Sequence, residues 1–201
     1  MRRMPAHDSL EARWIFSSIL QMGEGGVLEV CGRLGPPGTD RNARAEYTLQ
    51  GLATYVAGQG IEADRSMFVS ALGRALRNPL PVEHASFLIA RLQVAGKGES
   101  IEALSRFLSD ERLCEPAAQA LVAIRVGSEV PLLASLPGAG RNRRITIING
   151  LGELRSRNAV EPLITEAKNE NSGVRLAALH ALANIGDSRA EQVLTNAAMT
   201  G

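Results

Sequence analysis

The chain has 201 residues, which is enough for one domain or one short array of repeats. Hydrophobic residues make up 45% of it but aromatic residues only 3%, which favours closely packed helices over a sandwich or barrel, whose strands are rich in aromatic and β-branched side chains. The 22 basic and 21 acidic residues give a formal net charge of +1, which argues against nucleic-acid binding by bulk charge but not against a local basic patch.

The two cysteines, Cys31 and Cys114, lie within apolar helical patterns, and neither has a CxxC partner. We therefore expect buried free thiols, with neither a disulfide nor a bound metal. The N-terminal arginines precede polar residues where a signal peptide needs an apolar stretch, and no apolar run reaches the roughly eighteen residues of a membrane span. With no visible signal peptide the default compartment is the cytoplasm, unless the sequence is part of a larger, exported protein.

Residues 1–41 predict a degenerate pair of helices that caps the array. Asp8 or Ser9 can cap a helix that runs to about Met22, and the glycine-rich stretch 23–26 is expected to break it. A second short helix is expected over 27–34. The sequence GPPGTD at 35–40 then predicts a loop.

From residue 42 onward the sequence repeats. First-helix anchor leucines are separated by 40, 29, 30 and 31 residues, and they are Leu52, Leu92, Leu121, Leu151 and Leu182. In the last four units a second leucine follows 12 residues later, at Leu104, Leu133, Leu163 and Leu194. Two registers that agree over four units indicate a solenoid. We expect units at 42–81, 82–112, 113–140, 141–173 and 174–201, the first expanded around 57–66 and the third shortened by PGAG at 137–140.

The last unit shows the pattern best. Its first helix carries an apolar stripe at helical spacing, formed by Val174, Ala177, Ala178, Ala181, Leu182 and Ile185. Gly186 is expected to end this helix, and Asp187 or Ser188 to cap the next one. The second stripe consists of Ala190, Val193, Leu194, Ala197 and Ala198. In this sequence no further unit covers the face with Val193, Leu194 and Ala198, so we expect it to be partly open, to a partner or for self-association.

The last two units resemble HEAT repeats of the short kind, also called phycobilisome-lyase-type repeats. The matching residues of the last unit are Val174-Arg175, Ala177-Ala178, Ala181-Leu182, Ile185-Gly186-Asp187, Ala190 and Leu194; those of the unit before it are Arg144, Leu151, Leu154, Ala159-Val160 and Pro162-Leu163. The resemblance covers about residues 42–198 and is weaker towards the start. Cys114 stands where other units have arginine, so a regular arginine ladder would be interrupted.

This resemblance implies an all-α fold, an α–α superhelix in which antiparallel helix hairpins form a right-handed solenoid. First helices would line the convex side and second helices the concave side, and each unit would contact mainly its neighbours.

The sequence contains no complete catalytic motif. The segment AGKGES at 95–100 matches a phosphate-binding loop only in part, because Arg91 stands where its first glycine belongs, and a helix junction is the better interpretation. His7, His84 and His180 lie far apart in the sequence, and His180 is expected to be exposed. The pair Asp110-Glu111 is better interpreted as a helix junction than as an acid–base pair. We therefore expect no catalytic residues, no metal and no cofactor.

Two groups of residues are candidates for partner binding. The first is arginine-rich, with only Glu153 to balance it, and consists of Arg141, Arg143, Arg144, Arg155 and Arg157. In a HEAT hairpin the first three of these arginines would open the first helix and the last two would lie in the turn at its other end, so we expect two groups about one helix length apart. The five arginines are interpreted either as solvated turns plus one packing arginine, or as contacts to an anion or acidic partner. The second lies on the second helices among side chains of both signs, and consists of Arg106, Lys168, Gln192 and Asn196. It is either merely the hydrated face of each hairpin or a surface for a protein or peptide.

Our main hypothesis is a non-enzymatic HEAT-repeat scaffold or interaction module that presents a concave helical surface to a protein partner, as a segment of a larger protein or alone. One alternative is an accessory repeat domain of an enzyme, either attached to a catalytic domain or similar to a bilin lyase. The lyase needs a bilin site, and no aromatic or cysteine cluster suggests one. A nucleic-acid-binding HEAT-like protein is the other alternative, which the near-neutral charge opposes.

Overall fold

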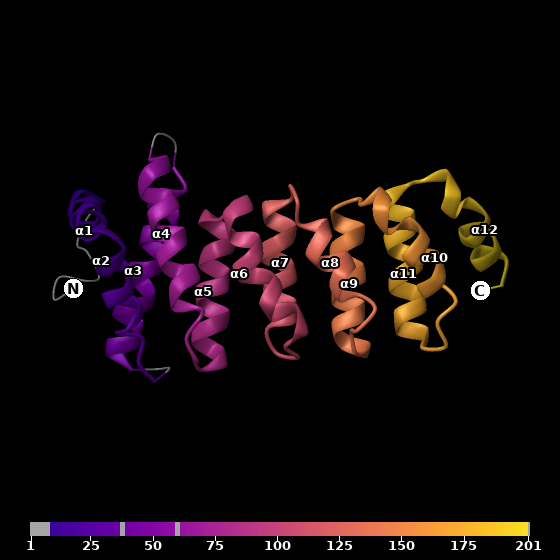
Figure 1. The fold of residues 1–201 in the computed structure, drawn as a ribbon, viewed down its shortest axis with the longest axis horizontal. Coiled ribbons are helices and arrows are strands. Elements are labelled where there is room, and N and C mark those ends of the chain that lie inside the picture. The colour runs from indigo at the N-terminus through magenta and orange to yellow at the C-terminus, as the bar shows by residue number, and fades with distance from the viewer. Residues whose placement is uncertain (1–8, 37–38, 59–60, 201) are drawn as a thin grey trace. The chain divides into compact units, whose positions relative to one another are not determined.

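The computed structural model describes residues 9–36, 39–58 and 61–200, and all regular structure within them is helical (Figure 1). The α-helices are, in chain order, α1 (Ser9–Gln21), α2 (Gly23–Cys31), α3 (Asp40–Val56), α4 (Glu62–Ala75), α5 (Val82–Ala95), α6 (Ile101–Ser105), α7 (Cys114–Ile124), α8 (Glu129–Ser135), α9 (Arg141–Glu153), α10 (Val160–Glu166), α11 (Ser172–Ile185) and α12 (Glu191–Thr200). Short 3₁₀ helices lie between some of them, namely η1 (Gly98–Ser100), η2 (Arg106–Ser109), η3 (Arg157–Ala159) and η4 (Ser188–Ala190). The chain is an all-α helical repeat protein that divides into two compact units, 1–103 and 104–201.

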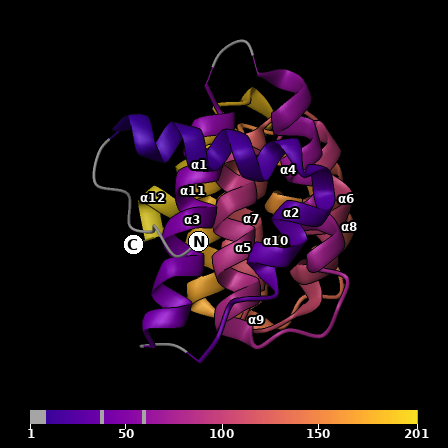
Figure 2. The same cartoon turned by 90° about the vertical axis from the view of Figure 1, so that its left-hand side faces the viewer.

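In the first unit α3 packs against α5 and α2 packs against α4, while α1 runs crosswise to α3 (Figure 2). Fully buried side chains from these helices form the core, among them Leu49, Leu52, Phe68, Leu72 and Leu88. The helices pack closely because they bury aliphatic and small residues with few aromatics, as the composition predicts.

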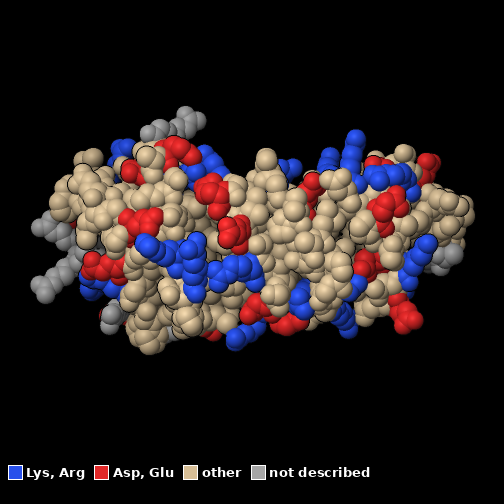
Figure 3. Space-filling view, in the orientation of Figure 1, with Lys and Arg blue, Asp and Glu red and all other residues tan. Residues whose placement is uncertain are grey.

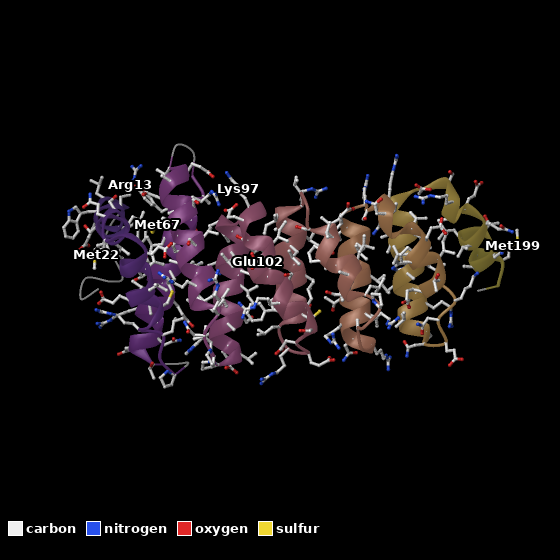
Figure 4. All side chains as sticks on the ribbon, in the orientation of Figure 1. Arg13, Met22, Met67, Lys97, Glu102 and Met199 are labelled. Carbon is white, nitrogen blue, oxygen red and sulfur yellow. The ribbon has the colours of Figure 1, made fainter. Side chains whose placement is uncertain are left out.

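The helix expected over 27–34 begins earlier, because α2 spans Gly23–Cys31 and only Met22 separates it from α1. Gly23 makes the bend with a φ of 65°, and Met22 lies 60% exposed there (Figure 4). Gly26 lies inside α2, where a Cβ atom would come within 2.6 Å of the Ile19 carbonyl oxygen. The predicted break after about Met22 is therefore present, but the prediction that the second helix starts only at 27 was wrong, since Gly26 allows close packing inside α2.

In the second unit the first helices α7, α9 and α11 lie side by side (Figure 1), and the contact between α9 and α11 is the most extensive. Gly152 on α9 makes this contact close, because a Cβ atom there would lie 2.8 Å from the Cα and Cβ atoms of Ala181. The second helices α8 and α10 pack against α9 and α11 respectively. The core runs through both layers, with Leu121, Leu132, Ile147, Leu151 and Leu163 fully buried.

The five first-helix anchor leucines, from Leu52 to Leu182, are all fully buried. In the third predicted unit the second anchor is shifted by one residue, because Leu132 is fully buried and Leu133 only half-buried. Pro131 lies within the short helix α8, and the 12-residue spacing between buried leucines in the other units does not hold in this unit. The division into five repeat units remains our proposal.

The last hairpin confirms the predicted helix ends. Gly186 ends α11 with a left-handed φ of 68°, and its N–H donates to the Leu182 carbonyl at 3.1 Å. The Asp187 carboxylate accepts a hydrogen bond from the N–H of Arg189 at 3.1 Å and so caps η4. At the other end of α11, the Asn171 side chain accepts from the N–H groups of Gly173 and Val174.

Both cysteines are free thiols. Cys114 is buried and Cys31 half-buried. Burial raises the pKa of Cys31 to about 12 and that of Cys114 to about 11, so neither sulfur is a ready nucleophile near neutral pH. None of the helices in the described ranges is long and apolar enough to cross a membrane.

Candidate interaction surfaces

The structure divides the arginine-rich candidates between the two ends of α9. Arg141, Arg143 and Arg144 open this helix, whereas Arg155 and Arg157 follow its end. The helix has 13 residues, so about 20 Å separates the two groups. The five arginines therefore do not form one basic cluster, and each group has its own neighbours.

Arg143 and Arg144 both form hydrogen bonds and ion pairs within the second unit. The Nε of Arg143 donates to Glu111 Oε1 at 2.9 Å, and its Nη1 donates to the Leu108 carbonyl at 3.4 Å. Arg144 Nε donates to the Ala139 carbonyl at 3.2 Å, and its Nη1 is bonded to Glu166 Oε1. Arg144 is thus a packing arginine, and Arg141 is the exposed member of this group.

Glu166 is buried to 8% exposure, and its second oxygen accepts from Asn169 Nδ2 at 2.9 Å. Burying a charged carboxylate costs free energy unless the charge is paired. The Arg144 guanidinium supplies that pairing for Glu166.

At the other end of α9, Arg155 and Arg157 are exposed. The carbonyl oxygen of Arg157 accepts from Arg189 Nη2 at 2.9 Å, and Arg189 also pairs with Asp187 through Nε at 2.8 Å. Hydrogen bonding from Arg189 lowers the pKa of Asp187 to about 2. This turn is therefore held by an ion pair next to the two candidates, and their own guanidinium groups face solvent.

The second-helix candidates Arg106, Lys168, Gln192 and Asn196 are all exposed. Lys168 and Asn196 line one groove of about 590 Å³ on the last hairpin. Its rim also holds Arg175 of α11, and its floor is aliphatic, formed by Leu176, Leu179, Val193 and Ala197. The groove offers apolar contact flanked by positive charge, with no acidic side chain among its described lining residues.

Sequence reasoning singled out Lys168 and Asn196 as candidates and Val193 as part of an open face, but it did not indicate that Leu176 and Leu179 join them. Leu176 and Leu179 lie off the buried stripe of α11, and Leu176 is 56% exposed. Two leucines outside the stripe of an amphipathic helix are a signal that the sequence did contain. The expected open face is present in part, since Val193 and Leu194 are half-exposed and Ala198 is exposed.

Two other hollows have different chemistry. Between α1 and α3 a hollow of about 420 Å³ is lined by Phe16, Tyr47 and Tyr55. Gly51 also lines it and lets the Phe16 ring pack closely, because a Cβ atom at Gly51 would lie 2.2 Å from that ring. A smaller hollow of about 150 Å³ between α7 and α9 is lined by polar groups that include the carboxylates of Glu115 and Glu153.

Asp110 and Lys97, which belong to two other sequence motifs, both make hydrogen bonds within the protein. Asp110 Oδ1 accepts from the N–H groups of Arg112 and Leu113 at 2.8 and 3.0 Å, as a helix junction requires. In the segment 95–100, which partly matches a phosphate-binding loop, Lys97 Nζ donates to Glu62 Oε2 at 2.8 Å.

The predicted absence of a histidine site can be examined at two of the three positions. His84 is buried, with Nε2 2.9 Å from the Gly35 carbonyl, while His180 is exposed as expected. His7 lies outside the described residues. Within those residues no three His, Cys, Asp or Glu side chains are grouped closely enough to hold a metal ion.

Residues 129–200, from α8 to α12, match the model of a family described as HEAT repeats. No curated protein matches the chain.

Proposed function

We propose that the chain is a non-enzymatic scaffold that presents the exposed side of its second helices to a protein partner, because residues 129–200 match the model of the HEAT-repeat family. In arrays of this kind each hairpin packs on its neighbours, so the polar side of the second helices is left as a continuous surface for recognition.

One observation carries this proposal. The second helices α10 and α12, together with the turn that follows α10, expose polar side chains of both signs, namely Glu161, Thr165, Lys168, Glu191, Gln192 and Thr195. Figure 3 likewise shows basic and acidic side chains interspersed on the visible face of each unit. A surface with both signs complements another protein better than a polyanion such as nucleic acid.

The location of the perturbed carboxylates also supports a non-catalytic role. Hydrogen bonds from Arg65 and Lys97 lower the pKa of Glu62 to about 2, and Arg189 does the same for Asp187. Glu62 is an ion-pair partner at the start of α4 and Asp187 is one at the start of η4, and neither lines one of the three hollows described above. Catalytic groups with shifted pKa values are usually found in a cleft.

Site-specific photo-cross-linking in the cells that make the protein tests the proposal. A cross-linker replaces Thr165 or Gln192 on the second helices, and matched controls carry it at exposed first-helix positions away from the last hairpin, Ala123 or Asn149. We expect discrete protein adducts from positions 165 and 192 and none from 123 and 149. Adducts from the first-helix positions alone, or from none of the four, would contradict the proposed surface.

A further inference from the structure

We propose that the groove between α11 and α12 binds an acidic aliphatic helix of the partner, with a carboxylate placed on Arg175 and leucine-like side chains on the groove floor. This inference rests on the proposed function, because it gives the chemistry of the partner at one part of the binding surface. It follows from comparing the last hairpin with the one before it.

The two hairpins correspond residue by residue at a shift of 31 positions. Leu151 and Leu182 correspond and are both fully buried, as are Ala159 and Ala190. The backbone corresponds too, because Arg155 and Gly186 both adopt a positive φ, of 52° and 68°. The hairpin of α9 and α10 is therefore a template for the environment of each residue in the last hairpin.

Arg144 and Arg175 occupy the same place in this template. Arg144 Nε donates to the Ala139 carbonyl at 3.2 Å, and Arg175 Nη1 donates to the carbonyls of Asn169 at 2.8 Å and Glu170 at 3.3 Å. Ala139 and Glu170 are also 31 residues apart, and each guanidinium hydrogen-bonds to the loop that precedes its own helix.

The two arginines differ in their acidic partner. Arg144 is paired with Glu166, and the residue that corresponds to Glu166 in the last hairpin is Ala197. Ala197 lies in the groove beside Arg175, and no carboxylate among the described residues forms an ion pair with that arginine. Lys168 adds a second positive charge to the same rim. A carboxylate from a partner therefore finds the position that Glu166 fills in the preceding hairpin.

The two leucines of the groove also differ from their counterparts in the preceding hairpin, because they are less buried. Ile148 of α9 is fully buried where α11 packs against its helix, and the corresponding residue Leu179 is only half-buried. Leu176, one turn before it, is 56% exposed. Since a helix covers the corresponding face of α9, an amphipathic helix is the occupant that suits these leucines.

Fluorescence anisotropy with the full chain tests this binding mode. The probe is a labelled amphipathic helical peptide of about four turns, with leucines on one face and glutamates beside them. One control peptide has lysine in place of every glutamate, and another has alanine in place of every leucine. We expect the probe to bind about tenfold more tightly than either control, and its affinity to fall as salt rises.

Ala197→Glu makes the test specific to this groove. The new carboxylate copies Glu166 and should pair with Arg175 within the chain, so we expect a higher melting temperature and about tenfold weaker binding of the probe. Ala197→Gln adds similar bulk without charge and should weaken binding less. Leu176→Asn should also weaken binding, whereas Val94→Asn at another exposed apolar position, on α5, should not.

Equal affinity for the glutamate and lysine peptides, or unchanged binding by Ala197→Glu, would overturn the inference. So would dimerisation in sedimentation experiments that Leu176→Asn abolishes, because a second copy would then fill the groove. If the probe fails to bind while cross-links still form from positions 165 and 192, the groove chemistry is wrong and the scaffold function stands. If the probe binds with the expected selectivity but those cross-links are absent, the groove inference stands and the second-helix surface is wrong.

Discussion

Arg155 holds a backbone conformation that glycine holds in the next hairpin. Its φ is 52°, and the φ of the corresponding Gly186 is 68°. A left-handed conformation costs a non-glycine residue roughly 1–2 kcal/mol, while glycine loses more entropy on folding, by about 0.5–1 kcal/mol. We expect Arg155→Gly to raise the free energy of unfolding by up to about 1 kcal/mol and Gly186→Ala to lower it by about 1 kcal/mol. Urea denaturation measures both, and destabilisation by Arg155→Gly would contradict the correspondence.

The pair Arg144–Glu166 yields a second prediction at this scale. Arg144→Met leaves the Glu166 carboxylate buried without its guanidinium and should lower the free energy of unfolding by about 3 kcal/mol. The double variant Arg144→Met, Glu166→Met removes both charges and should recover much of that loss. A double-mutant cycle in urea measures the coupling, and additive effects of the two changes would argue against the pair.

Asp187 predicts a dependence of stability on pH. Its pKa falls from 3.8 to about 2 on folding, because Arg189 stabilises the charged carboxylate. The folded protein thus holds this proton less tightly, and the stabilisation is fully present above about pH 4 and is lost as pH falls towards 2. Asp187→Asn should therefore be less stable than the natural chain at pH 6, with a difference that shrinks steadily below pH 4. A difference that stays constant over this range would contradict the pairing.

The sequence predicted these residues unevenly. It offered one packing arginine among the five as one of two interpretations, and it indicated a helix end at Gly186 from the local pattern. It did not indicate that Glu166 is buried beneath Arg144, because this depends on how α10 folds back on α9. It also gave no sign that Arg155 is left-handed, since arginine has no preference for that conformation.

At the scale of the helix, the approach of α9 to α11 depends on Gly152. Gly152→Val would force side-chain atoms against Ala181, and we expect a loss of about 2 kcal/mol in the free energy of unfolding. Gly25→Ala in α2 is the matched control, because a Cβ atom there meets nothing within 4 Å. It should stabilise the helix by about 0.5–1 kcal/mol. Equal effects of the two substitutions would show that α9 and α11 are not in close contact.

The helices themselves were largely predictable because the buried residues of the first helices follow a helical period. The exceptions are instructive. Gly26 lies within α2, where the absence of a Cβ atom leaves room for the carbonyl of Ile19. A sequence pattern cannot show how much space surrounds a glycine. In α8 the buried leucine is Leu132, because the short helix of the third unit does not keep the spacing of its neighbours.

At the scale of the whole molecule, the sequence predicted the repeat architecture and the separation of the arginines into two groups, one at each end of α9. It did not predict the groove. The groove needs Leu176 and Leu179 of α11 to face Val193 of α12, and this arrangement depends on the packing of the hairpin. Its distinctive feature is an absence, the alanine at 197 where the preceding hairpin has a glutamate, and it becomes visible only when the two hairpins are compared.

Hydrogen–deuterium exchange on the full chain, with and without the glutamate–leucine peptide, tests most directly whether the chain recognises a partner through its second unit. Binding in the groove predicts slower exchange in α12 and the first half of α11, and unchanged exchange in α3 and α5 of the first unit. Protection confined to the first unit, or unchanged exchange in α11 and α12 at saturating peptide, would contradict recognition by the last hairpin.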